Sequence, residues 1–236
     1  MPNPEQEKAN LFARIIARVR VRRFSYLAKS LVLLIIAYPY LEANTLDQII
    51  LTLLTIMVMI AAIIAVSKRR RDYIIMAVLS LPWFVSLIVN LPLFELDGGV
   101  IIRKEIVFAV LLFFYTTISI FIHLIRSREV TTEILFAAVC VYLLIGLSWA
   151  ALYVLIELVT PGSFVDTSGH LAMTPPRYLF FSFVTLTTVG YGNIIPATDQ
   201  ARSIAVIEAI VGQLYITIMV ARLVGLHISK PRAPEA

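Results

Sequence analysis

Six apolar segments, each near the length needed to cross a bilayer, dominate this chain of 236 residues. A bilayer core of about 30 Å is crossed by a helix of roughly 20 apolar residues, because lipid offers the backbone no hydrogen-bond partners. Hydrophobic residues make up 60% of the chain and charged residues 15%, unlike any soluble domain of this size. The sequence therefore predicts an all-α membrane protein with six transmembrane helices. The segments are 26–41, 48–67, 73–94, 106–125, 134–158 and 203–226.

A short polar stretch, Thr185 to Asn193, separates the fifth and sixth segments and reads TLTTVGYGN. An apolar, Thr-rich run precedes it, and Pro196 and a new apolar helix follow it, as a loop that re-enters the membrane requires. A row of carbonyl oxygens aimed at one axis needs backbone angles that alternate between ordinary and left-handed regions, which glycine adopts at little cost. We therefore expect Gly190 and Gly192 to supply the left-handed angles.

On this motif and its flanks, residues 174–225 resemble the potassium channel family. The resemblance implies a selectivity filter in which carbonyls replace the hydration shell of K⁺, with K⁺ as the permeant ligand and no cofactor. An ordinary turn between two membrane helices is the alternative. The chain holds one such motif and no internal repeat, so a four-fold filter requires a homotetramer. The implied K⁺-binding filter residues are Thr188, Val189, Gly190, Tyr191 and Gly192.

The flanks of the filter predict its supports. Residues 160–173 have the composition of an exposed outer loop, and Thr174 before two prolines is a good start for a pore helix that runs to about Thr187. The carboxyl end of this helix favours a cation in a central cavity. Relatives place large aromatic residues here, so an aromatic collar is expected, although plain packing is the alternative. The predicted filter supports are Thr187, Asn193, Phe180, Phe181 and Val184, with Tyr191 completing the collar.

Two of these supports depart from the family pattern. Asn193 stands where relatives commonly carry Asp, and Val184 stands where some relatives carry a second acid that braces the filter. We therefore expect a filter held by different contacts, more prone to inactivate or less sharply selective.

The sixth segment carries the candidate gate. The resemblance makes Gly212 a gating hinge, although a glycine in a membrane helix is also commonly a close-packing point. Residues that follow at three- and four-residue steps share one face, which either lines the inner cavity or packs against a neighbour. The predicted hinge and gate residues are Gly212, Gln213, Ile216, Val220 and Val224.

Glu208, one turn before Gly212, is a possible functional acid because an ionisable group is costly inside an apolar helix. It is expected to bond behind the filter, to approach Arg177 or Arg202, or to reach the outer interface.

The basic residues predict the orientation. Sixteen of the twenty Lys and Arg residues fall at the two termini and in the second and fourth loops, which places both termini in the cytoplasm and the filter outside. Net charge of +5 thus reports topology and not a nucleic-acid partner. The expected regions are a basic amphipathic segment at 1–25, a four-helix sensor-like domain at 26–128, a pore domain at 129–228 and a cytoplasmic tail at 229–236.

Gating is less constrained. Residues 106–125 contain no Lys or Arg, so the fourth helix lacks the charges of a voltage sensor. The tail is too short for a ligand-binding domain, and the basic N-terminal segment suggests contact with anionic lipids, or merely fixes topology. A cleaved signal peptide is not expected.

The sequence thus predicts a voltage-independent, K⁺-selective channel of a plasma or inner membrane, of the bacterial type. No nucleophile with its base, metal-ligand cluster or phosphate-binding loop indicates an enzyme. The alternatives are a weakly selective or non-conducting channel relative, supported by Asn193, and a secondary transporter, to which only Pro82 and Pro92 point.

Overall fold

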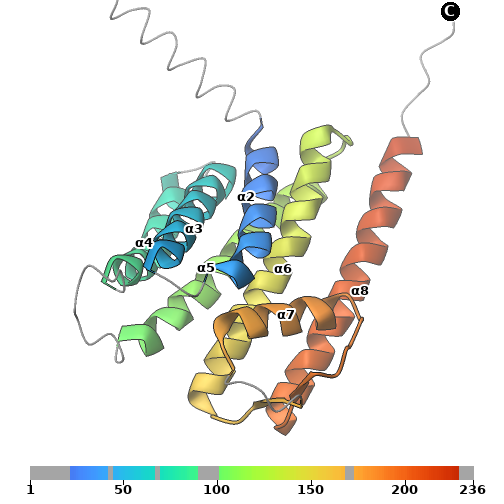
Figure 1. The fold of residues 1–236 in the computed structure, drawn as a ribbon. Coiled ribbons are helices and arrows are strands. Elements are labelled where there is room, and N and C mark those ends of the chain that lie inside the picture. Colours follow the sequence, from blue (N-terminus) through green and yellow to red (C-terminus); the bar gives the residue numbers. More distant parts are fainter. Residues whose placement is uncertain (1–21, 42–44, 67–69, 90–100, 168–172, 229–236) are drawn as a thin grey trace, which may run out of the picture.

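Long helices pack side by side, with a short helix and a two-stranded hairpin at one end (Figure 1). The computed structural model describes residues 22–41, 45–66, 70–89, 101–167 and 173–228. Most of the predicted segment 1–25, Pro92 and the predicted tail lie outside these residues. The helices are α2 (Arg23–Ala37), η1 (Tyr38–Tyr40), α3 (Thr45–Val66), α4 (Arg70–Val89), α5 (Ile101–Arg126), α6 (Thr132–Val159), α7 (Pro175–Leu186) and α8 (Asp199–Ile228). The strands are β1 (Phe164–Asp166) and β2 (Ile194–Pro196).

Each predicted apolar segment corresponds to one helix, and four of the helices in the described part of the chain are long and apolar enough to cross a membrane. Helix α2 has 15 residues, which at about 1.5 Å per residue is shorter than a bilayer core. Helix α4 begins with two arginines and an aspartate and continues through Pro82. The six-span count therefore stays a prediction. The four spans are Ile49–Val66, Ile106–Arg126, Thr132–Val159 and Asp199–Ile228.

Helix α6 forms the centre of the described structure. It packs against α2 and α5 on one side and against α7 and α8 on the other. Four of its side chains, those of Ala137, Cys140, Val141 and Tyr153, have no exposed surface. Thr131 starts the helix, because its side chain accepts a hydrogen bond from the Ile134 amide at 3.3 Å. The pore-loop elements are therefore built directly on the most buried helix of the bundle.

The two ends of the bundle differ. Helix α2 begins and α8 ends at the same end, and α7 with the hairpin lies at the opposite end (Figure 1). At the first end, the Arg222 guanidinium of α8 donates to the carbonyl oxygens of Ile125 and Ser127, where α5 ends. Two turns earlier in α8, the Tyr215 hydroxyl donates to the Ala138 carbonyl of α6 at 2.6 Å. The last helix is thus tied to both α5 and α6.

Candidate functional site

Helix α7 enters the bundle between α6 and α8 and ends where the filter motif begins (Figure 1). Its first two residues are the prolines that follow Thr174, as predicted. The Thr174 side chain makes no capping bond; the Thr174 carbonyl accepts from the Arg177 amide at 2.9 Å, and the two prolines have no amide hydrogen to satisfy. The carboxyl end lies at Leu186, and Thr187 caps it.

The backbone of the motif alternates in hand. Thr188, Gly190 and Gly192 have φ of 60°, 59° and 77°, and no residue between them has a positive φ. Gly190 and Gly192 thus adopt the predicted left-handed angles. Thr188 is a third left-handed residue, and the only non-glycine residue in the described chain with a positive φ. The alternation extends one step further toward α7 than the glycines alone indicate.

The inner half of the motif is bonded to the pore helix through the backbone. The amides of Val189 and Gly190 both reach the carbonyl oxygen of Val184, at 3.0 and 3.4 Å, and the Thr188 amide reaches the Thr185 carbonyl at 2.9 Å. Val184 therefore supports the motif with its carbonyl oxygen and needs no acidic side chain for that contact. The Thr187 hydroxyl turns back to the Phe183 carbonyl at 2.6 Å.

Thr167, in the outer loop, holds the outer half of the motif. Its amide donates to the Asn193 carbonyl at 2.8 Å, and its hydroxyl lies 3.0 Å from the Gly192 carbonyl and 3.2 Å from that of Asn193. Thr167 directly follows β1, which pairs antiparallel with β2. An ion pair between Arg177 and Asp166 joins the same loop to the start of α7. Sequence reasoning missed Thr167, because nothing in its local sequence distinguishes it from other loop residues.

The predicted aromatic residues separate into two groups. The ring of Phe180 stacks on Tyr191 with centroids 6.0 Å apart and planes 6° apart. Phe181 points into the protein instead, where its ring lies 5.1 Å from that of Tyr153 and 5.4 Å from that of Phe164. Phe180 alone pairs with the filter tyrosine, and Phe181 anchors α7 in the core.

The inner helix meets the pore helix at Gly212. A Cβ atom at this position would lie 2.5 Å from the Leu186 carbonyl oxygen, so the two backbones approach too closely for any side chain. Helix α8 continues through Gly212 without a break. The side-chain amide nitrogen (Nε2) of Gln213, the next residue, lies 3.5 Å from the Thr188 hydroxyl at the inner end of the motif. The structure thus brings the predicted hinge region and the filter motif into direct contact.

The predicted gate residues share one exposed face of α8. Ile216, Val220 and Val224 are exposed, whereas Tyr215 and Met219 pack into the bundle. The filter motif is also exposed, with 53% of Val189 and 71% of Tyr191 open. These exposed groups belong to one continuous part of the chain, from the motif along α8.

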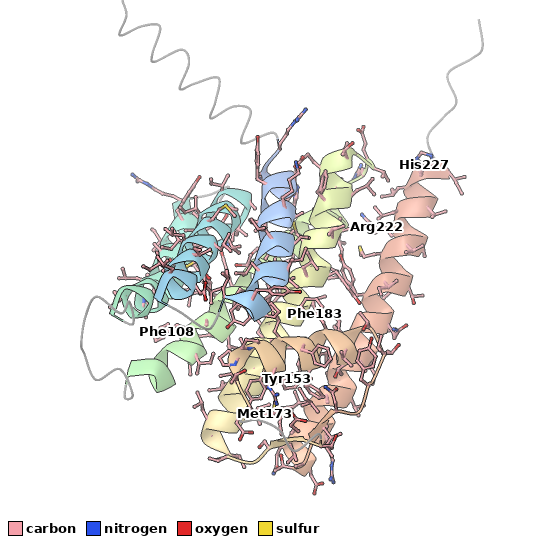
Figure 2. The ribbon with its side chains drawn as sticks, in the orientation of Figure 1. Phe108, Tyr153, Met173, Phe183, Arg222 and His227 are labelled. Carbon is pink, nitrogen blue, oxygen red and sulfur yellow. The ribbon has the colours of Figure 1, made fainter. Side chains whose placement is uncertain are left out.

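Glu208 lies behind the pore helix with none of its surface exposed. Its carboxyl group bonds with Ser182 of α7 and Tyr153 of α6. The predicted alternatives, Arg177 and Arg202, bond to Asp166 and Asp199. Figure 2 shows Tyr153 and Phe183 where α6, α7 and α8 come together. Among the described residues, no group of three or more His, Cys, Asp or Glu side chains could hold a metal ion.

Comparisons with known proteins place the likeness in this part of the chain. Residues 130–226 match a protein family described as ion channel. The chain is 32% identical over 114 residues to the inward rectifier potassium channel Kirbac3.1 of Paramagnetospirillum magnetotacticum, covering 48% of this chain and 32% of that protein. It is 31% identical over 79 residues to two pore potassium channel c of Oryza sativa subsp. japonica, covering 34% and 17%. No solved structure matches it significantly.

These matches confirm the predicted resemblance to potassium channels over the region that holds α6, α7, the filter motif and α8. The chain spans about a third or less of the length of these curated relatives. Together with its apolar helices, the match supports a multi-pass helical membrane protein whose residues 130–226 are similar to ion channels.

Proposed function

We propose that this chain, which matches the ion channel family over residues 130–226, is one subunit of a homotetrameric channel that conducts K⁺ passively and selectively. The observation that carries the proposal is the alternation of left-handed angles at Thr188, Gly190 and Gly192. Alternating hand along an extended strand turns successive carbonyl oxygens toward one side. Four such strands around an axis form rings of oxygens that replace the water around K⁺.

The surroundings of the motif support its use as a filter. The amides of Val189 and Gly190 bond backward to α7, which leaves the opposite side of this strand to the ion path. The carboxyl end of α7 carries partial negative charge and directs it to the space below the filter, where a cation is stabilised. In that space Gln213 contacts the Thr188 hydroxyl. K⁺ is therefore the permeant ligand, and we propose no other cofactor.

Exposure in the single chain supports assembly from four copies. Apolar side chains of the filter and of α8, such as Val189, Ile216 and Val220, are 40% to 56% exposed. In a tetramer, Gln213, Ile216, Val220 and Val224 face the axis and form the inner cavity, and Val220 or Val224 narrows its mouth. Hydrophobic constrictions of this kind gate by dewetting.

The four helices before the pore domain do not form a voltage sensor in this proposal. Helix α5 holds Arg103 and Lys104 in its first turn, but its span Ile106–Arg126 carries no other Lys or Arg before its last residue. A voltage sensor moves charge through the transmembrane electric field, which requires several Lys or Arg residues inside the membrane. Both ends of the described chain lie on the side opposite the filter, which supports cytoplasmic termini in a cell membrane.

Purified protein in planar lipid bilayers tests this function. With K⁺ on one side and Na⁺ on the other, we expect single-channel currents that reverse near the K⁺ equilibrium potential, with an open probability that stays flat over voltage. Large quaternary ammonium ions are expected to block them from the inner side. A reversal potential near zero, or no current, contradicts the K⁺-selective proposal, and steep voltage dependence contradicts the missing sensor.

A weakly selective channel is the second candidate, and the residues at 184 and 193 favour it. Val184 and Asn193 offer no carboxyl pair behind the filter. The double variant Val184→Glu, Asn193→Asp restores both acids. If the wild type selects weakly, this variant is expected to shift the reversal potential toward the K⁺ value and to lengthen openings; unchanged values in both respects count against a role for these positions.

A further inference from the structure

A carboxyl group is buried in the middle of an apolar contact between three helices. Glu208 lies within the span Asp199–Ile228, and none of its surface is exposed. It forms no ion pair with any residue that the structure describes. An isolated carboxylate in such a place is expensive, because neither water nor a cation compensates its charge.

Two hydroxyl groups meet this carboxyl group, one from each neighbouring helix. Tyr153 of α6 donates to Oε2, and the Ser182 Oγ atom of α7 lies 2.5 Å from Oε1. Ser182 Oγ also lies 2.7 Å from the carbonyl oxygen of Gly146 in α6. The cluster of Tyr153, Ser182 and Glu208, with the Gly146 carbonyl, thus links α6, α7 and α8 at one point. We call it the clasp.

The number of hydrogens in the clasp decides the protonation of Glu208. A serine hydroxyl has one hydrogen, and a carbonyl oxygen has none to give. Ser182 Oγ faces two oxygen atoms, and its single hydrogen can serve only one of them. The Gly146 carbonyl can only accept, so Ser182 donates its hydrogen to that carbonyl. The contact between Ser182 Oγ and Glu208 Oε1 then needs a hydrogen on the carboxyl group, because two lone pairs would repel at 2.5 Å.

Resting on the proposed function, we infer that Glu208 carries a proton and serves as a neutral positioning residue that holds the pore helix, and through it the filter, against α6 and α8. Ser182 lies two residues before Val184, whose carbonyl accepts the amides of Val189 and Gly190. A loosened α7 therefore shifts the acceptor on which the inner half of the filter depends.

Two close contacts hold α7 against α6 and α8 near the clasp. A Cβ atom at Gly146 would lie 2.7 Å from the Phe183 ring, and one at Gly212 would lie 2.5 Å from the Leu186 carbonyl oxygen. The clasp adds directional bonds to these two contacts. Among the described residues, Tyr153 is the ionisable group that bonds to Glu208.

Infrared spectroscopy of the full chain in lipid at neutral pH tests the proton directly. The control is Asp199→Asn, which removes a carboxylate from the same helix where its side chain is 93% exposed. We expect the difference spectrum between wild type and Glu208→Gln to contain the carbonyl band of a protonated carboxyl group, and the D199N difference to contain carboxylate bands. Carboxylate bands in the E208Q difference would overturn the inference. This measurement needs no current, so it stands even if the proposed channel function fails.

Currents in planar bilayers test the positioning role. Gln reproduces the neutral form, because its carbonyl accepts from Tyr153 and its amide hydrogen reaches Ser182. We expect E208Q to keep the wild-type reversal potential and current decay. Glu208→Leu and Ser182→Ala each break the clasp, and their currents are expected to decay about tenfold faster, as the loss of one buried hydrogen bond implies.

Two outcomes would overturn the positioning role. If E208Q loses function as E208L does, the charge of Glu208 is what matters. If E208L and S182A both keep wild-type currents, the clasp does not position the filter. Should E208L fail to assemble, S182A and E208Q alone still decide between these outcomes, because each changes only one partner. D199N is expected to behave as wild type throughout.

Discussion

Replacing Gly212 by alanine is expected to separate the inner helix from the pore helix. The added methyl would lie 2.5 Å from the Leu186 carbonyl oxygen and 2.8 Å from Leu186 Cδ1. Real Cβ atoms essentially never come within 3.0 Å of such atoms, so α8 and the end of α7 must move apart by at least 0.5 Å. The obstacle is backbone, which yields less easily than the tip of a flexible side chain. We therefore expect a cost near the upper end of the range for overpacking, about 3 kcal/mol.

Gly225→Ala is the matched control on the same helix. Nothing lies within 4 Å of a Cβ atom at Gly225. Both variants gain about 1 kcal/mol of helix propensity from the replacement of glycine, so G225A is expected to be neutral or slightly stabilised. Relative to wild type, G212A is then expected to be destabilised by about 2 kcal/mol, the overpacking cost less this gain.

The single cysteine provides the assay. Cys140 is fully buried in α6, so a thiol-reactive fluorophore reports unfolding of purified protein in detergent as temperature rises. We expect labelling of G212A at a clearly lower temperature than labelling of wild type or G225A, together with faster decay of K⁺ currents in bilayers. If G212A and G225A unfold together, the close contact with Leu186 does not constrain the native protein and the reasoning is wrong. Equal stability with altered gating would instead favour the hinge interpretation.

Three further outcomes are expected. Thr167→Val removes the hydroxyl that contacts the Gly192 and Asn193 carbonyls, so the outer filter should close about tenfold faster in current recordings, whereas Thr167→Ser keeps wild-type kinetics. Arg222→Gln weakens the bonds to the carbonyls of Ile125 and Ser127; a changed open probability with an unchanged reversal potential is expected, and a shifted reversal potential would contradict this. Gating currents of the wild type should be absent over the range of voltages in which pore currents are recorded, because α5 contains no Lys or Arg between Ile106 and Ile125.

The local features of the pore loop could be predicted from sequence, because they depend on neighbouring residues. The glycines at 190 and 192 predict left-handed backbone angles, and Thr174 before two prolines predicts the start of α7. Thr188 was not expected to have a positive φ, since threonine disfavours it; the bonds of the next two amides to Val184 hold it there.

Contacts between distant segments could not be predicted from sequence. Glu208 was identified as unusual from its apolar surroundings, but its partners lie 26 and 55 residues away, and no periodicity connects them. The collar shows the same limit. Phe180 and Phe181 are adjacent residues of the same type, so the sequence does not distinguish them. The rotation of α7 against α6 decides that Phe180 stacks on Tyr191 and that Phe181 packs against Tyr153. The observed helix ends also differ from the predicted ones by a few residues, because capping residues and Pro39 in η1 determine where the helices end.

The hairpin and its Thr167 contacts have a consequence for biogenesis. β1 and β2 pair within one chain, and the bonds from Thr167 and Val184 that shape the filter strand also come from that chain. These bonds require no second copy of the chain, so they are available to a newly inserted monomer. In the proposed tetramer, a substitution that removes the Thr167 hydroxyl is therefore expected to alter the filter strand of its own subunit, and intact neighbouring subunits do not supply the missing bond.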